Sequence, residues 1–267
     1  MPQPRTIDDV IERLEAIIAE SIRTDSRLGY FAALYNRVTQ RVKLGIERGE
    51  FDDGPRMERL DVTFATRYLD AYDQFRAGQV PSRSWLLAFG AAGADDHAVI
   101  QHLLVGMNAH ILLDLGVAAA RTCPGAELAP LRDDFNRIND VLATLTPVVE
   151  HELDETSFDF GALSSIAPKL ELKIVGAAMR EARAAAWSLA THLAPLSLTD
   201  QLRPMATRDD EAVLLGEASL MPGPLVAFIR RTESPDVAHN IRILASGEFA
   251  IPPVPADIAA GHLLSAR

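Results

Sequence analysis

Apolar residues recur at intervals of three and four along most of the chain, which predicts a succession of amphipathic helices. Thr6 can cap a helix, and the residues after it follow this spacing at Val10, Leu14, Ile17 and Ile18. Glycine and proline mark the ends of most later segments with the same pattern. The predicted helices span about residues 7–22, 28–48, 56–77, 81–92, 95–121, 130–145, 170–193, 209–220, 224–231 and 235–244.

This pattern predicts an all-α fold, a single-domain multi-helix bundle around a buried central helix at about residues 95–121. No run of alternating β-branched residues is long enough for a strand, and no internal repeat indicates a solenoid. The domain is expected to cover residues 1–246. Residues 247–267, which contain Pro252, Pro253 and Pro255, are expected to form an extended or poorly ordered tail. The alanine-rich helix at 170–193 should pack against the central helix.

Composition narrows the class of protein. The chain has 267 residues, 48% of them hydrophobic, so it can bury a sizeable core. Its net charge of −11 disfavours nucleic acid and anionic membranes as partners. A single cysteine, Cys123, excludes an intrachain disulfide and fits a reducing compartment. The N-terminal segment lacks the order of a signal peptide, so we expect a cytoplasmic location.

Polar residues interrupt the most apolar part of the central helix, QHLLVGMNAHILLDLGVAAA at residues 101–120. At about 100° per residue, His102, His110 and Asp114 follow one gently drifting face, and Gly106 leaves space between the two histidines. The run approaches the length of a membrane span, but His110 and Asp114 fall in its middle. Because unpaired polar groups are costly to bury, a buried helix whose polar residues have partners is the prediction.

Asn108 and Gln101 lie on the opposite face, and Asn108 is expected to bond to neighbouring backbone. Two other features are interpreted as structural or left open. Arg67 could pair with an interior acid or form a surface ion pair. Trp85, Trp187, Tyr68 and Tyr72 fit core positions.

The His110–Asp114 spacing fits two kinds of chemistry. It can present two ligands to one divalent metal such as zinc, iron or manganese, with His102 as a third. It also lets a carboxylate orient an imidazole for acid–base work. A metal site would need further ligands, and the candidates are His151, Glu152, Glu155, Asp61 and Asp70. In the competing interpretation, His102, His110 and Asp114 are hydrogen-bonded core residues.

Four segments carry a resemblance to a known family: GEFDDGPRMERLDVTFATRYLDAY, the 101–120 run, DDFNRINDVL and ARAAAWSLA. Together they resemble the bacterial family called domain of unknown function 5995. The similarity is strong over about residues 48–193, and GMNAH-to-DL is its most specific block. The resemblance implies an all-α cytoplasmic protein and brings no activity with it.

A second similarity is to the zinc phospholipase C and P1 nuclease group, whose helices carry a His-x3-Asp pair. This chain lacks that group's N-terminal tryptophan ligand and a histidine soon after Asp114. Two hypotheses follow. The first is an enzyme acting on a small molecule in an interhelical pocket through His102, His110 and Asp114. The second is a non-catalytic small-ligand-binding or interaction protein, and the apolar helix faces also permit a homodimer.

Overall fold

A computed structural model describes residues 3–156 and 168–246, and it confirms the all-α prediction, since no strand occurs among these residues. A π-helix, η1 (His110–Leu115), and a 3-10 helix, η2 (Gly125–Leu131), interrupt the regular helices. The α-helices are α1 (Ile7–Arg23), α2 (Leu28–Glu47), α3 (Gly54–Arg76), α4 (Arg83–Ala91), α5 (Val99–Ala109), α6 (Gly116–Thr122), α7 (Arg132–Thr156), α9 (Pro168–Leu193), α10 (Leu198–Leu220), α11 (Pro224–Thr232) and α12 (Val237–Ser246).

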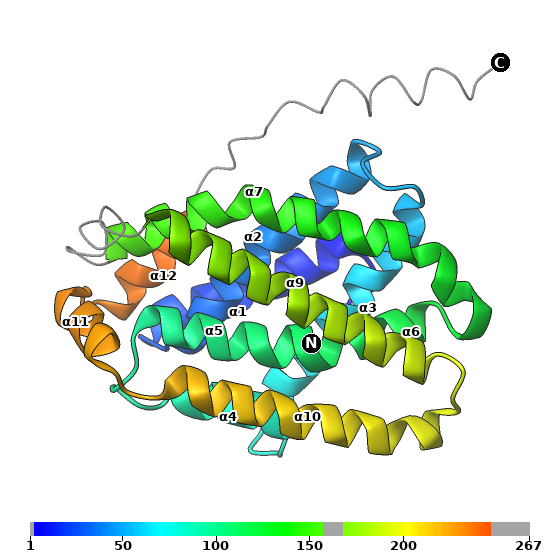
Figure 1. The fold of residues 1–267 in the computed structure, drawn as a ribbon. Helices are drawn as coiled ribbons and strands as arrows, with labels where there is room; N and C mark the ends of the chain where they lie inside the picture. Colours follow the sequence, from blue (N-terminus) through cyan, green and yellow to red (C-terminus); the bar gives the residue numbers. More distant parts are fainter. Residues whose placement is uncertain (1–2, 157–167, 247–267) are drawn as a thin grey trace.

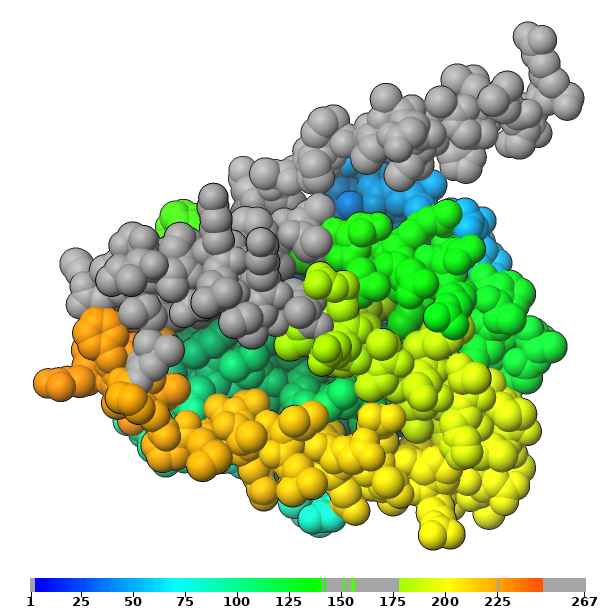
Figure 2. Space-filling model, in the orientation of Figure 1, coloured from blue at the N-terminus to red at the C-terminus, as the bar shows by residue number. Residues whose placement is uncertain are grey.

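The central helix is the continuous run of α5, η1 and α6, and the other helices surround it (Figure 1). α4 and α10 cover α5, while α3 and α9 cover α6. The expected contact with the alanine-rich helix is confirmed, because a side chain at Gly116 would lie 2.6 Å from the carbonyl oxygen of Ala186 on α9. Figure 2 shows α7, α9 and α10 on one face of the molecule. The absence of a side chain at Gly116 therefore permits the close approach of α6 and α9.

The π-helical turn lies where two hydrophobic cores meet. The first core contains the α5 residues Leu103 and Ala109 together with side chains of α1, α2, α3 and α4. The second contains Leu113, the apolar part of α6 and the inner face of α9. π-Helical turns within α-helices are rare, and those that do occur are often found at functional sites. η1 contains both His110 and Asp114.

Three predictions at prolines were wrong. α7 continues through Pro147 to Thr156 instead of ending near residue 145. α10 begins at Leu198 and passes through Pro204, whereas the prediction began it at 209. A proline removes one helical hydrogen bond and crowds the preceding turn, but a long helix with packed neighbours can absorb that loss. Asp236, rather than Ser234-Pro235, caps α12, because its carboxylate accepts from the His239 amide at 2.8 Å.

The apolar central helix is buried in the bundle. By length and composition alone, Val99–Thr122 is the one described helix that could cross a membrane, and 78% of its most apolar window is buried. The core helix of a soluble protein passes the same test. It begins at Val99 rather than near 95, and the Gln101 side chain accepts from the Ala98 amide at its start. The predicted tail at 247–267 lies outside the described residues.

Candidate functional site

Asp114 is the best-connected polar side chain of the central helix. It is 1% exposed, and both of its carboxylate oxygens accept hydrogen bonds. Arg67 of α3 donates from Nε to Oδ1 at 2.6 Å, and Trp85 of α4 donates from Nε1 to Oδ2 at 2.7 Å. His110 Nδ1 lies 3.3 Å from the same Oδ2. Arg67 thus pairs with an interior acid, which was one of the two interpretations of its position.

His110 is bonded on one side only. Because its Nδ1 faces the Asp114 carboxylate, the neutral ring carries its proton on Nδ1 and leaves a lone pair on Nε2. Nε2 is buried without a hydrogen-bond partner. The ring stacks on Phe64 at a centroid distance of 3.6 Å and meets the edge of Tyr35 at 4.5 Å. Aromatic packing and Asp114 therefore fix the ring in one orientation.

The charges of this pair follow from its surroundings. Burial lowers the pKa of His110, against the opposing influence of Asp114. Burial acts to raise the pKa of Asp114, but Arg67, His110 and Trp85 outweigh it and hold that pKa below its usual value. At neutral pH the pair is a neutral imidazole next to a carboxylate. This is the arrangement in which a carboxylate orients a general base and stabilises the imidazolium that forms when it accepts a proton.

His110 lines an apolar cavity of about 100 Å³ between α2, α3, η1, α7 and α9. Most of its walls are aliphatic or aromatic, which is typical of small-molecule sites. The polar residues in the wall are Tyr35, Asp61, His110 and Arg183. The apolar residues are Phe31, Leu34, Val38, Val42, Met57, Leu60, Phe64, Met107, Ile111, Leu115, Phe135, Ile138, Leu142 and Met179.

Asp61 brings a second titratable group to this cavity. It is 8% exposed, and its Oδ2 is buried without a hydrogen-bond partner. Burial, with a smaller contribution from the charge of Glu58, raises the pKa of Asp61 to about 7. A carboxyl group with such a pKa is partly protonated at neutral pH and can act as an acid. The cavity therefore combines a neutral base with a carboxylic acid, a pairing found in acid–base active sites.

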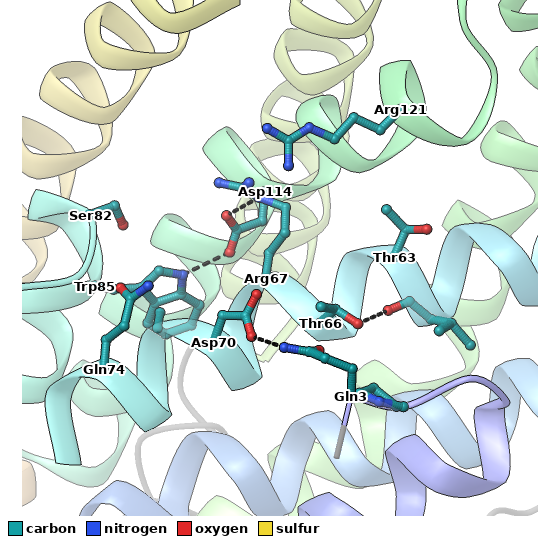
Figure 3. A pocket seen from close by; sticks show the side chains of 13 residues that line it. Gln3, Thr63, Thr66, Arg67, Asp70, Gln74, Ser82, Trp85, Asp114 and Arg121 are labelled. Carbon is teal, nitrogen blue, oxygen red and sulfur yellow. Dashed lines mark hydrogen bonds and ion pairs between the residues drawn. The ribbon is translucent and has the colours of Figure 1, made fainter. Parts of the chain in front are cut away.

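A separate polar groove lies beside the other end of the pair. It has a volume of about 500 Å³ and is lined by Arg67, Trp85, Asp114 and Arg121, among others. Figure 3 shows the Asp114 carboxylate between Arg67 and Trp85, with Arg121 above it. Thr66 in the same groove uses its hydroxyl on a backbone carbonyl. The His110–Asp114 pair thus contacts two spaces, a polar groove through Asp114 and an apolar cavity through His110.

His102 does not join this site, although it was predicted to share one face with His110 and Asp114. Its ring lies 5.6 Å from that of Tyr30 and 5.9 Å from that of His97. The space expected over Gly106 is filled, because a side chain there would lie 2.6 Å from the Phe31 ring. Burial, reinforced by nearby positive groups, lowers the pKa of His102 to about 4.

The other candidate metal ligands whose side chains are described are also dispersed, and the Glu152 side chain lies outside the described part of the chain. Asp70 lines the polar groove and accepts from Gln3, and His151 pairs with Glu155 at 3.4 Å on the exposed side of α7. Within residues 3–156 and 168–246, no group of three or more His, Cys, Asp and Glu side chains could hold a metal ion. The oxygens of Asp114 already face a guanidinium and an indole N–H. The described donors therefore fit acid–base chemistry better than metal binding.

Asn108 bonds to neighbouring backbone, as predicted, and Gln101 does so too. Asn108 donates to the carbonyl of Ala212 on α10, and Gln101 donates to that of Ser219 at 3.0 Å. Their role is to attach α10 to α5.

Sequence reasoning missed Arg183 and gave Asp61 only a minor place. Both could have been found from helical phase. Asp61 follows Met57 and precedes Phe64 on one face of α3, and Arg183 precedes Ala186 and Ala190 on one face of α9. A charged residue in phase with an apolar stripe indicates burial.

Comparison with known proteins identifies the family and adds no activity. No curated protein and no solved structure matches the chain significantly. The model of one protein family matches residues 7–222, a span that includes Asp61, Arg67, His110, Asp114 and Arg183. The chain therefore belongs to a family of unknown function, DUF5995, as its sequence resemblance had indicated.

Proposed function

We propose that this protein is an enzyme that transfers protons on a small, mainly apolar molecule held in the cavity beside His110. One observation carries the proposal: the Nε2 atom of His110 is buried without a partner at an apolar cavity, while Nδ1 is held by Asp114. Buried nitrogen atoms normally have hydrogen-bond partners, and an exception calls for an explanation. A ligand in the cavity supplies one.

The reaction type follows from the two titratable groups. His110 Nε2 would accept a proton from a carbon next to a carbonyl group, and the electron pair of that C–H bond would form the enol double bond. Asp61, in its protonated form, would donate its proton to the carbonyl oxygen. Asp114 would stabilise the positive charge on the imidazole. Return of a proton to carbon completes an isomerisation or an exchange, and no metal is needed.

The size of the cavity limits the molecule. An engineered apolar cavity of roughly 150 Å³ holds benzene, so about 100 Å³ corresponds to a ligand of about four to six non-hydrogen atoms. Butanone has this size and carries exchangeable hydrogens on both sides of its carbonyl group.

Hydrogen–deuterium exchange tests the proposal. The protein is incubated with butanone in D2O, and the loss of the signals from the carbons next to the carbonyl group is followed by proton NMR. We expect His110→Gln to slow the protein-dependent exchange by about 100-fold or more, within the range of general-base contributions. His239→Gln, at an exposed histidine of α12, is the matched control and should leave the rate unchanged.

The pH profile gives a second readout. Since the Asp61 carboxyl loses its proton above about pH 7 while His110 stays neutral, exchange should fall as the pH rises through 7. Solution exchange catalysed by hydroxide has the opposite trend. Equal rates for the wild type and His110→Gln would exclude the proposal.

A non-catalytic small-ligand-binding protein is the second candidate. It is favoured by the fixed donors that occupy both oxygens of Asp114, because such a group suits a structural role. Binding of butanone without any His110-dependent exchange would support this alternative.

A further inference from the structure

Arg183 gives the cavity a charged group that has no ion-pair partner among the described residues. It is 4% exposed, yet it forms no ion pair with any described carboxylate. Two other buried arginines do have such partners: Arg41 pairs with Glu50 at 2.9 Å and Arg13 with Asp73 at 2.9 Å. A buried charge without a partner is costly, so its presence calls for a reason.

The geometry of Arg183 leaves part of its guanidinium available. Nη2 donates to the carbonyl oxygen of Phe135, and Cζ lies 4.5 Å above the centre of the Phe135 ring. Nε is buried without a hydrogen-bond partner, and the side chain lines the apolar cavity. The guanidinium is thus held against α7 while its Nε donor remains unused. A planar guanidinium is suited to binding a carboxylate.

Arg183 and Asp61 occupy different parts of the cavity wall. Arg183 comes from α9 and Asp61 from α3, and the charge of neither contributes to the pKa of the other: burial lowers that of Arg183, and burial with Glu58 raises that of Asp61. A ligand between them would meet a cation at one part of the cavity and the acid–base groups at another.

We infer that the physiological ligand is a short-chain oxo acid whose carboxylate binds Arg183. This inference rests on the proposed function, since it places the carbonyl group of the same molecule near His110 and Asp61. The apolar walls between these groups would enclose a short carbon chain. The carboxylate would be the negatively charged partner of the Arg183 guanidinium. One of its oxygens would accept a hydrogen bond from the unused Nε donor.

Binding of butyrate and butyramide tests the inference, because the two have the same shape and differ in charge. Affinities measured by isothermal titration calorimetry should be at least tenfold higher for butyrate with the wild-type protein. Arg183→Met should bring the butyrate affinity down to that of butyramide, while Arg183→Lys should retain part of the preference. Arg180→Met, at an exposed position one turn away on α9, is the matched control and should keep the full preference.

The outcomes separate the inference from the proposed function. Equal affinities for butyrate and butyramide, or a butyrate affinity unaffected by Arg183→Met, would overturn the carboxylate assignment even if His110 catalyses exchange in butanone. Failure of the wild type to bind butyrate would overturn it as well. Arg183-dependent binding of butyrate with no His110-dependent exchange would sustain the carboxylate site and reject the enzyme.

Discussion

The two ends of the His110–Asp114 pair differ in how completely their hydrogen bonds are satisfied. Asp114 receives donors from Arg67, Trp85 and His110, which come from three segments of the chain. His110, Asp61 and Arg183 line the apolar cavity, and the buried atoms Nε2, Oδ2 and Nε of these residues lack hydrogen-bond partners. Both ends are buried to a similar degree. Burial alone therefore does not distinguish the two ends of the pair, whereas the number of unused donors and acceptors does.

This difference predicts opposite consequences of substitution. Residues at the Asp114 end should matter most for stability, because removing one partner leaves the others buried and unpaired. Residues at the cavity end should matter little for stability, or even reduce it, because they already lack partners. Stability and function can be compared in the same set of variants.

The largest effect is expected for Asp114→Ala. Loss of the carboxylate leaves the Arg67 guanidinium and the Trp85 N–H without their acceptor, so the free energy of unfolding should fall by about 3–5 kcal/mol. Urea denaturation measures this change. Asp73→Ala removes the partner of Arg13 at a half-exposed position, and should cost about 1 kcal/mol or less. Similar losses in both variants would contradict a special role for the Asp114 network.

Asp61→Asn should change how stability depends on pH. Burial raises the folded-state pKa from 3.8 to about 7, so between these values the folded protein holds a proton that the unfolded chain has released. Stability therefore falls as the pH rises through this window, by at most ~1.4 kcal/mol per pH unit, and the destabilisation is complete above pH 7.

Asparagine has no proton to lose, so Asp61→Asn should be more stable than the wild type at pH 8 by about 1–3 kcal/mol. The two proteins should converge near pH 4. Urea denaturation at pH 5, 6, 7 and 8 gives the comparison, with the exposed Asp210→Asn as the control. A constant difference at all four pH values would argue against a buried, protonated Asp61.

Arg183→Met should stabilise the free protein by about 1–2 kcal/mol, because an apolar side chain of similar length replaces a buried cation that has no carboxylate partner among the described residues. Differential scanning calorimetry without ligand shows this as a higher Tm. Butyrate at saturating concentration should reverse the order by stabilising the wild type selectively. A lower Tm for Arg183→Met in the absence of ligand would mean that Arg183 serves the fold.

The smallest change in stability is expected for His110→Gln, about 1 kcal/mol, because the glutamine amide can still donate to Asp114 and the main loss is the packing of the ring on Phe64 and Tyr35. The same variant should lose the exchange activity. A combined loss of several kcal/mol would place His110 with Asp114 among the residues that hold the fold. Circular dichroism and urea denaturation give the readout.

Helical periodicity was sufficient for much of the fold. The Thr6 cap and the stripe of Val10, Leu14 and Ile17 placed α1 within one residue of its observed end at Arg23. Prediction failed at Pro147 and Pro204, where local rules end a helix but the surrounding contacts continue it. The π-helical turn was also missed, because HILLDL contains neither glycine nor proline and its α-helical propensity is ordinary.

The site was predictable only as far as one helix reaches. The i, i+4 spacing correctly placed His110 next to Asp114. It did not show that Phe31 from another helix fills the space over Gly106, or that Trp85, Asp61 and Arg183 converge on η1 from three other helices. Such contacts depend on how helices pack, and a single sequence does not encode their crossing angles in any simple period.

η1 has a consequence for the geometry of the whole bundle. A π-helical turn holds about one residue more than an α-helical turn. The residues of α6 therefore point about 100° away from the directions that they would have if α5 continued as an uninterrupted α-helix. The central helix can therefore direct one stripe of apolar side chains to the first core and a differently oriented stripe to the second. If the six residues of η1 formed a regular α-helical turn instead, Gly116 would be turned away from α9. Deleting one residue from η1 would remove the extra residue of the π-turn and leave Gly116 facing α9, so the contact between α6 and α9 depends on the match between the length of η1 and its helical form.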